Sequence, residues 1–208
     1  MLDAVLFDWS NTLVKFTWDD DLLRAGHRAG LGRDDPVFTE RYREMVFARK
    51  GEDYASLLRE LGVDDPDAFI DAEHEVWRPA NEVLGAARAL LETLRERGFM
   101  TALVAKAWPE PERVLRADVK RFGLAELFDA MVFSGNPMDA LHELGVEPEA
   151  ALYVGDTLGS DVQRAADAGM TTIQALWFVA EDNPAGVEPD FQAFTPMDVL
   201  NIALRVAR

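Results

Sequence analysis

The sequence contains no cysteine among its 208 residues, and it has few positive charges. The absence of cysteine excludes disulfides, thiolate nucleophiles and zinc–thiolate sites. The 21 Lys and Arg residues are outnumbered by 38 Asp and Glu residues, which gives a formal net charge of −17. A surface of this sign repels phosphate backbones and anionic lipids, so we expect neither a nucleic-acid nor a membrane partner.

Long hydrophobic runs are also missing. No apolar run approaches the roughly 20 residues that a membrane helix requires, and Met1-Leu2-Asp3 does not begin a basic segment followed by an apolar one. We therefore expect a cytoplasmic protein. With 49% hydrophobic and 28% charged residues, the composition is that of a globular protein. The length favours one domain, or one domain with a modest insert.

Short apolar runs alternate with helical patterns along most of the chain. Continuous apolar runs are typical of strands buried on both faces of a parallel sheet. We expect strands at residues 4–7, 101–104, 130–133, 151–154 and 171–176. We expect helices at residues 86–97, 111–122 and 161–168, each followed by a glycine suited to a helix C-terminus, and a final helix from Thr195-Pro196. Residues 180–189 are expected to form a surface loop. This alternation predicts an α/β fold with a mostly parallel sheet.

The first predicted strand is followed by an insertion in which no strand pattern is convincing. Its apolar residues have helical spacing, with Asp-Pro entries and Gly breaks, at residues 20–29, 36–50, 53–61 and 66–76. The sequence thus predicts a core domain at 1–15 and 80–208, with a small helical cap domain at 16–79.

Acidic residues follow two of the predicted strands. Asp8 ends the first strand, and Gly155-Asp156 ends the strand at 151–154, with Asp161 five residues after Asp156. In an open parallel sheet, ligands bind beyond the carboxyl ends of strands. Clustered carboxylates there suit a hard divalent cation. The alternative is that Asp, Asn and Ser are ordinary turn and cap residues.

These motifs resemble those of the haloacid dehalogenase superfamily of hydrolases and phosphatases. The resemblance extends over nearly the whole chain and is carried by Asp8, Ser10, Thr12, Leu13, Gly155, Asp156 and Asp161. It implies a Rossmannoid core with the first and fourth strands adjacent, and a cap hinged near 16–18 and 77–80. It also implies that Asp8 is a nucleophile and that Mg²⁺ is held by Asp8, the Ser10 carbonyl, Asp156 and Asp161.

Three positions depart from the family pattern. The acid/base position holds Ser10 instead of Asp, and a hydroxyl is too weak an acid to protonate an alkoxide effectively near pH 7. The second motif ends in Ala105 instead of a hydroxyl donor. The third motif, at residues 133–137, is shortened and lacks its usual Lys.

Other side chains are candidates for substrate binding. Lys106 follows the second strand and could replace the missing lysine in catalysis; the alternative is a solvated loop lysine. Trp9 could wall the pocket or pack in the core. In the core, the remaining candidates are Asn11, Thr12 and the Ala105 position. In the cap, Arg24 and His27 lie on one predicted helix and could bind an anionic substrate; the alternative is that they belong to a solvated helix face.

The leading functional hypothesis is a Mg²⁺-assisted hydrolase that acts on a small anionic substrate, phosphorylated or otherwise activated, through a covalent intermediate on Asp8. A dehalogenase-like enzyme acting at carbon stays open. So does a catalytically weak or inactive binding or regulatory module, because one scaffold hosts several roles. We expect a monomer or a homodimer.

Overall fold

The computed structural model describes residues 1–17, 19–178 and 186–207, which form two compact units. The core unit comprises Met1–Lys15, Val83–Lys106 and Val119–Arg208, and the cap unit comprises Phe16–Glu82 and Ala107–Asp118. The predicted cap, at 16–79, does not include the second of these cap segments. The sequence of Ala107–Asp118 does not distinguish this segment from a core helix, because its apolar spacing is that of any helix packed on a sheet.

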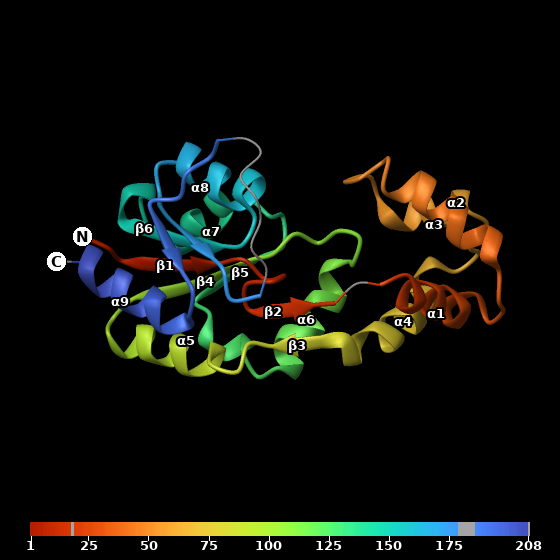
Figure 1. Ribbon diagram of the computed structural model, residues 1–208, viewed down its shortest axis with the longest axis horizontal. Coiled ribbons are helices and arrows are strands. Elements are labelled where there is room, and N and C mark those ends of the chain that lie inside the picture. The colour runs from red at the N-terminus through yellow and green to blue at the C-terminus, as the bar shows by residue number, and fades with distance from the viewer. Residues whose placement is uncertain (18, 179–185, 208) are drawn as a thin grey trace. The chain divides into compact units, whose positions relative to one another are not determined.

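The core unit is built on a six-stranded sheet in which every strand pair is parallel (Figure 1). The strands are β1 (Ala4–Phe7), β4 (Met100–Val104), β5 (Ala130–Val132), β6 (Ala151–Gly155), β7 (Thr171–Ala175) and β8 (Phe191–Ala193). Their order is β5-β4-β1-β6-β7-β8. The predicted α/β fold is confirmed, and β1 and β6 are neighbours as expected, with Phe7 opposite Val154. From β1 the chain adds β4 and β5 on one side of the sheet and then β6, β7 and β8 on the other, so the strand order reverses between β1 and β6. We therefore expect a ligand site at the carboxyl ends of these two strands.

Helices cover both faces of this sheet. They are α5 (Ala87–Glu96), α7 (Pro137–Leu144), α8 (Gln163–Asp167) and α9 (Pro196–Val206). Apolar residues of α7 and α8 join those of the central strands in one buried cluster. Helices α5 and α9 lie together on the opposite face (Figure 1). The start of α9 at Pro196 is as predicted, and Thr195 and Asp198 form a capping box there.

The cap unit contains the four helices expected in the insertion. They are α1 (Asp20–Leu31), α2 (Pro36–Val46), α3 (Tyr54–Glu60) and α4 (Pro66–Trp77), and the first turns of α6 (Glu112–Arg121) belong to the same unit. An aspartate caps each of the four, since the carboxylates of Asp19, Asp35, Asp53 and Asp65 accept a backbone N–H three residues on.

Helices α1 and α4 approach closely because α1 carries two glycines on the shared face. A Cβ at Gly26 would lie 2.5 Å from Nε1 of Trp77, and one at Gly30 would lie 2.5 Å from the Phe69 ring. Any larger side chain would force these helices apart, so the cap core depends on both glycines.

Three short strands were not predicted. Two of them, β2 (Val14–Phe16) and β3 (Asn81–Val83), pair in a two-stranded sheet, and the third is β8. Each has only three residues, too few to show an alternating pattern. Trp18, in the predicted hinge, and residues 180–185 of the predicted loop lie outside the described residues. In the described part of the chain, no helix is long and apolar enough to cross a membrane.

Candidate active site

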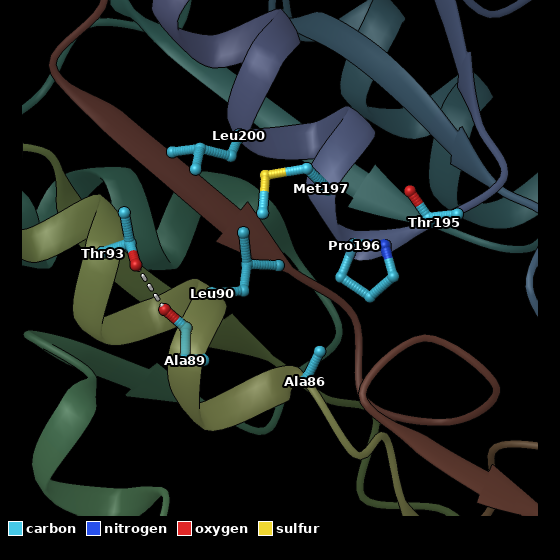
Figure 2. Close-up of a pocket in the computed structure, with 8 residues that line it drawn as sticks. All are labelled: Ala86, Ala89, Leu90, Thr93, Thr195, Pro196, Met197 and Leu200. Carbon is cyan, nitrogen blue, oxygen red and sulfur yellow. Dashed lines mark hydrogen bonds between the residues drawn. The ribbon is translucent and has the colours of Figure 1, made fainter.

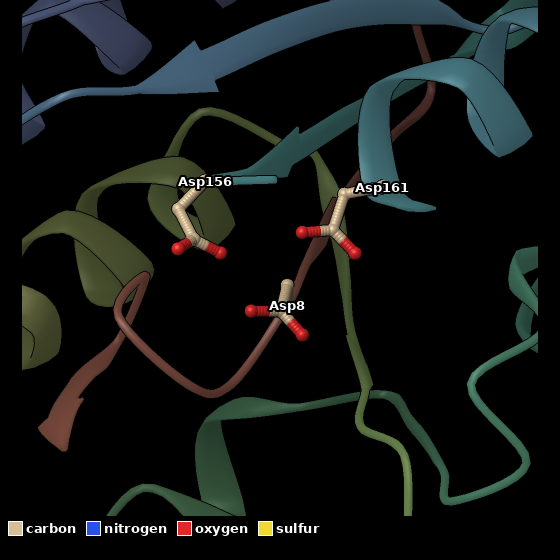
Figure 3. A group of neighbouring side chains, drawn as sticks. All are labelled: Asp8, Asp156 and Asp161. Carbon is tan, nitrogen blue, oxygen red and sulfur yellow. The ribbon is translucent and has the colours of Figure 1, made fainter. Parts of the chain in front are cut away.

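Three carboxylates converge at the carboxyl ends of β1 and β6. Asp8 follows β1, Asp156 follows β6, and Asp161 lies on a π-helical turn, η4 (Leu158–Val162). One carboxylate oxygen from each lies within 4.8 Å of the others (Figure 3). We call this group the carboxylate cluster. The structure therefore brings together the three acidic residues that the motifs singled out.

The backbone around the cluster explains its close geometry. The Asp8 amide donates to the Val154 carbonyl at 2.9 Å, so the pairing of β1 with β6 extends to the first carboxylate. A Cβ at Gly155 would lie 2.5 Å from the Cβ of Asp161. Only glycine at this position lets η4 bring Asp161 against the end of β6.

Thr157 links the other two carboxylates. Its amide donates to Oδ2 of Asp161 and its hydroxyl donates to Oδ1 of Asp156, both at 3.1 Å. These bonds fix the side chains while leaving other oxygen lone pairs for a ligand. π-Helical turns are rare and occur often at functional sites.

Burial and mutual repulsion make the cluster electrostatically costly. Burial raises the pKa of Asp8 well above its ordinary value, and the charges of Asp161 and Asp156 raise it further. The Trp9 amide and the Thr12 hydroxyl oppose this rise. Burial also raises the pKa of Asp161 to about 7, aided by Asp156 and opposed by the Thr157 amide. Three oxygen donors whose charges repel one another are a suitable ligand set for a hard divalent cation.

The turn after Asp8 contains three further candidate residues, Ser10, Asn11 and Thr12. The Ser10 side chain is exposed, and Asn11 adopts a left-handed conformation with φ 56°. Thr12 is fully buried, and its carbonyl accepts a bond from Nε1 of Trp177 at 2.9 Å. Nothing in the sequence marked Trp177, because its partner is a backbone atom far away in the chain.

Trp9 packs in the core. It is 5% exposed, and its ring centroid lies 6.1 Å from that of Phe122. This agrees with the packing alternative for this residue.

The second-motif candidates lie where β4 ends. Ala105 is buried, and its carbonyl accepts the Gly135 amide at 2.9 Å. Lys106 is exposed, and its backbone forms a bridge with Ser134. The ends of β4 and β5 are thus tied together beside the altered second and third motifs.

One cap candidate does not occupy the predicted position. Arg24 is exposed on α1, as a substrate-binding face requires. His27 is 1% exposed: its Nδ1 lies 2.9 Å from the Thr39 hydroxyl and its ring packs against Tyr42. Burial lowers the pKa of His27 to about 4, so this imidazole is neutral near pH 7. His27 is a core residue of the cap and cannot attract an anion there.

The cap also contains buried ionisable groups that the sequence did not reveal. His74 makes ion pairs with Asp118 at 3.1 Å and Glu110 at 3.3 Å. The Tyr54 hydroxyl donates to Glu73 at 3.1 Å, and Glu73 is 1% exposed. The partners are distant in sequence, so no local spacing could have identified them. All of them belong to the cap unit.

A separate hollow of about 200 Å³ lies between α5 and α9 (Figure 2). Its lining is uncharged and consists of Ala86, Ala89, Leu90, Thr93, Thr195, Pro196, Met197 and Leu200. The Thr93 hydroxyl is already used, since it donates to the Ala89 carbonyl at 2.7 Å. No charged side chain lines this hollow, so the carboxylate cluster is the better candidate for chemistry.

The family model for haloacid dehalogenase-like hydrolases matches residues 2–169. The chain belongs to the haloacid dehalogenase-like hydrolase family. The resemblance inferred from the motifs is thereby confirmed, and the chain is a hydrolase by family. It is 30% identical to a glyceraldehyde 3-phosphate phosphatase of Methanopyrus kandleri, an alignment that covers all of both chains.

Two further proteins illustrate this family relationship. A phosphoglycolate phosphatase of Aquifex aeolicus is 32% identical over 96% of this chain and 95% of its own. A HAD phosphatase from Thermococcus onnurineus has a similar structure, with a TM-score of 0.73, 22% identity and 97% coverage of both chains. At that identity the structural match supports the fold alone.

Proposed function

We propose that this protein is a Mg²⁺-dependent phosphatase that acts on a small phosphorylated substrate through a covalent intermediate on Asp8. The observation that carries the proposal is the convergence of Asp8, Asp156 and Asp161 within 4.8 Å at the strand-order switch. The relatives named above as phosphatases support the choice of a phosphoryl group over other leaving groups.

Asp8, Asp156, Asp161 and the Ser10 carbonyl would hold Mg²⁺. When bound, this ion supplies positive charge that offsets the carboxylates and the incoming anion. The fit rests on the donor set, which is three partly buried carboxylates with no soft ligand among them.

Asp8 supplies the attacking oxygen. A bond forms from its carboxylate oxygen to phosphorus while the bond from phosphorus to the leaving oxygen breaks. Water then attacks the phosphorus of the aspartyl phosphate, which releases inorganic phosphate and regenerates the carboxylate. Dividing the hydrolysis in this way replaces one difficult displacement by two easier ones.

Ser10 shapes the choice of substrate. Its hydroxyl cannot protonate an alkoxide efficiently, so substrates whose leaving groups need little protonation, such as aryl or acyl phosphates, are favoured. Small alkyl phosphates are expected to react more slowly, with water as the proton source.

The test is a panel of acetyl phosphate, p-nitrophenyl phosphate, phosphoglycolate, glyceraldehyde 3-phosphate and 2-chloropropionate, assayed with and without Mg²⁺. We expect Mg²⁺-dependent release of phosphate, fastest from acetyl phosphate. Chloride release in the absence of phosphatase activity would favour the dehalogenase-like alternative. Mg²⁺ binding without any turnover would favour a binding or regulatory module, for which the substitutions at Ser10 and Ala105 are the supporting observations.

A further inference from the structure

Arg164 lies at the edge of the carboxylate cluster and was not among the candidates drawn from the sequence. It is the second residue of α8, three residues after Asp161, and it is exposed. Its Nη1 donates to the carbonyl of Gly135. The side chain therefore extends from the helix that follows Asp161 to the end of β5, where the third motif lacks its usual lysine.

Gly135 stands between two cationic residues. It has φ +70°, a left-handed conformation that favours glycine. A Cβ placed on it would lie 3.1 Å from the Cβ of Lys106 and 3.5 Å from Nη1 of Arg164. The bare backbone of Gly135 thus allows Lys106 and Arg164 to approach the same turn from β4 and from α8.

The position of Arg164 also matters for charge. Three carboxylates and one divalent cation leave a net negative charge, which repels an anionic substrate. Arg164 is the second residue of α8 and lies three residues after Asp161, so its positive charge is carried on the helix that directly follows this carboxylate.

We propose that Arg164 binds the non-bridging oxygens of the substrate phosphoryl group and so replaces the cation missing from the third motif. The assignment rests on the phosphatase function proposed above. A guanidinium has five N–H donors in a planar fork, so the bond to Gly135 leaves others for a phosphate oxygen. The same bond orients the fork, which limits the side-chain entropy lost when an anion binds. Lys106 adds charge beside it but has no comparable anchor among the described contacts.

The alternative role for Arg164 is structural, as a clamp on the Gly135 turn. The two roles are separated by calorimetric titration of inorganic phosphate in saturating Mg²⁺ against wild type, Arg164→Gln and Arg164→Lys. Arg205→Gln is the matched control, because Arg205 is an arginine of the core unit whose guanidinium packs on the Phe191 ring, 4.8 Å from its centroid. Mg²⁺ affinity and the melting temperature are measured on the same samples.

We expect Arg164→Gln to weaken phosphate binding about 10- to 100-fold, as loss of a charged hydrogen bond does. Mg²⁺ affinity should stay equal or improve, Arg164→Lys should recover part of the phosphate affinity, and Arg205→Gln should bind like wild type. In turnover of p-nitrophenyl phosphate, KM should rise by a similar factor.

Unchanged phosphate affinity and KM in Arg164→Gln would overturn the proposal, and so would failure of wild type to bind phosphate. A wild type that binds phosphate through Arg164 yet hydrolyses nothing in the panel would instead contradict the proposed function and leave Arg164 as an anion-binding residue.

Discussion

The two units each bury a group of acidic side chains, but they neutralise them differently. In the cap unit, burial alone would lower the pKa of His74, but hydrogen bonds to Asp118 and Glu110 and their charges raise it to about 9, so it is a cation at neutral pH. Glu73 has its pKa raised well above the ordinary value by burial, and it accepts the Tyr54 hydroxyl. The cap therefore neutralises these acidic side chains with its own residues, either by an ion pair with His74 or by protonation of the acid.

The carboxylate cluster of the core unit instead brings three acidic side chains together at the ends of two neighbouring strands. Burial raises the pKa of both Asp8 and Asp161, the charge of Asp156 raises both further, and the charge of Arg164 opposes the rise at Asp161. Buried like charges reduce stability unless they are compensated. We infer that the cap group serves folding whereas the core cluster is kept for a ligand. The predictions below test this contrast by changing one group at a time.

The largest effect is expected from Asp8→Asn. Loss of the nucleophile should lower kcat for acetyl phosphate by at least about 10⁴-fold. The melting temperature should stay equal or rise, because a repelling charge is removed. Steady-state kinetics and thermal melts check both parts. A variant that keeps substantial turnover would show that Asp8 is not the nucleophile.

Ser10→Asp, in contrast, should increase the activity of the core site. Restoring a general acid, typically worth about 10²–10⁴-fold, should speed hydrolysis of an alkyl phosphate more than of an aryl or acyl phosphate. The comparison of kcat for phosphoglycolate and acetyl phosphate in wild type and variant measures this. Equal gains, or none, would indicate that anion binding at Ala105 and the third motif limits the reaction instead.

His74→Gln should damage the cap and leave the core cluster intact. Removing one partner of this buried ion pair should lower the free energy of unfolding by about 3 kcal/mol. Since the folded-state pKa of His74 is raised, its contribution is fully present below about pH 6.5 and is lost as pH rises through about 9.

Urea unfolding at pH 7 and pH 10 measures this difference, with the exposed His142→Gln as control. Mg²⁺ affinity should match that of wild type. If His74→Gln left the free energy of unfolding at pH 7 unchanged, the claim that the His74 ion pairs stabilise the cap would be contradicted.

The smallest effect concerns the pH dependence of the core cluster without metal. The pKa of Asp161 is raised to about 7 in the folded state, so this acid contributes stability that is present below about pH 3.8 and lost as pH rises through 7. In a chelator, wild type should lose about 1–2 kcal/mol relative to Asp161→Asn between pH 5 and pH 8, after allowance for solvent screening.

Saturating Mg²⁺ at pH 8 should restore the wild-type stability, and urea unfolding measures both conditions. A constant difference between the two proteins across this range would mean that Asp161 is not destabilised in the folded state.

Much of the fold could be predicted from the sequence because buried parallel strands are continuous apolar runs. The strands β1, β4, β5, β6 and β7, the cap helices and the start of α9 at Pro196 all have such local marks. The segment 107–118 could not be assigned to the cap, because its ties to α4, such as the bond from Arg113 to Asp71, join residues far apart in the chain. The strands β2, β3 and β8 are fixed by their partners and not by their own pattern.

The candidate site also contains residues that a local motif identifies and residues that only tertiary contacts bring together. Asp8, Asp156 and Asp161 were identified because each lies in a motif at a strand end. His27 was misassigned because helical spacing places a residue on a face but does not say whether that face meets solvent or other helices. Arg164 was missed because its partner, the Gly135 carbonyl, is a backbone atom brought near by the sheet. Tertiary contacts of this kind leave no local trace in the sequence.

The central claim is that the core cluster holds Mg²⁺, and thermal melts of wild type and Asp156→Asn in a Mg²⁺ titration test it most directly. The account predicts a clear rise in the wild-type melting temperature at millimolar Mg²⁺, largely lost in Asp156→Asn and preserved in His74→Gln. Identical responses of wild type and Asp156→Asn would contradict it.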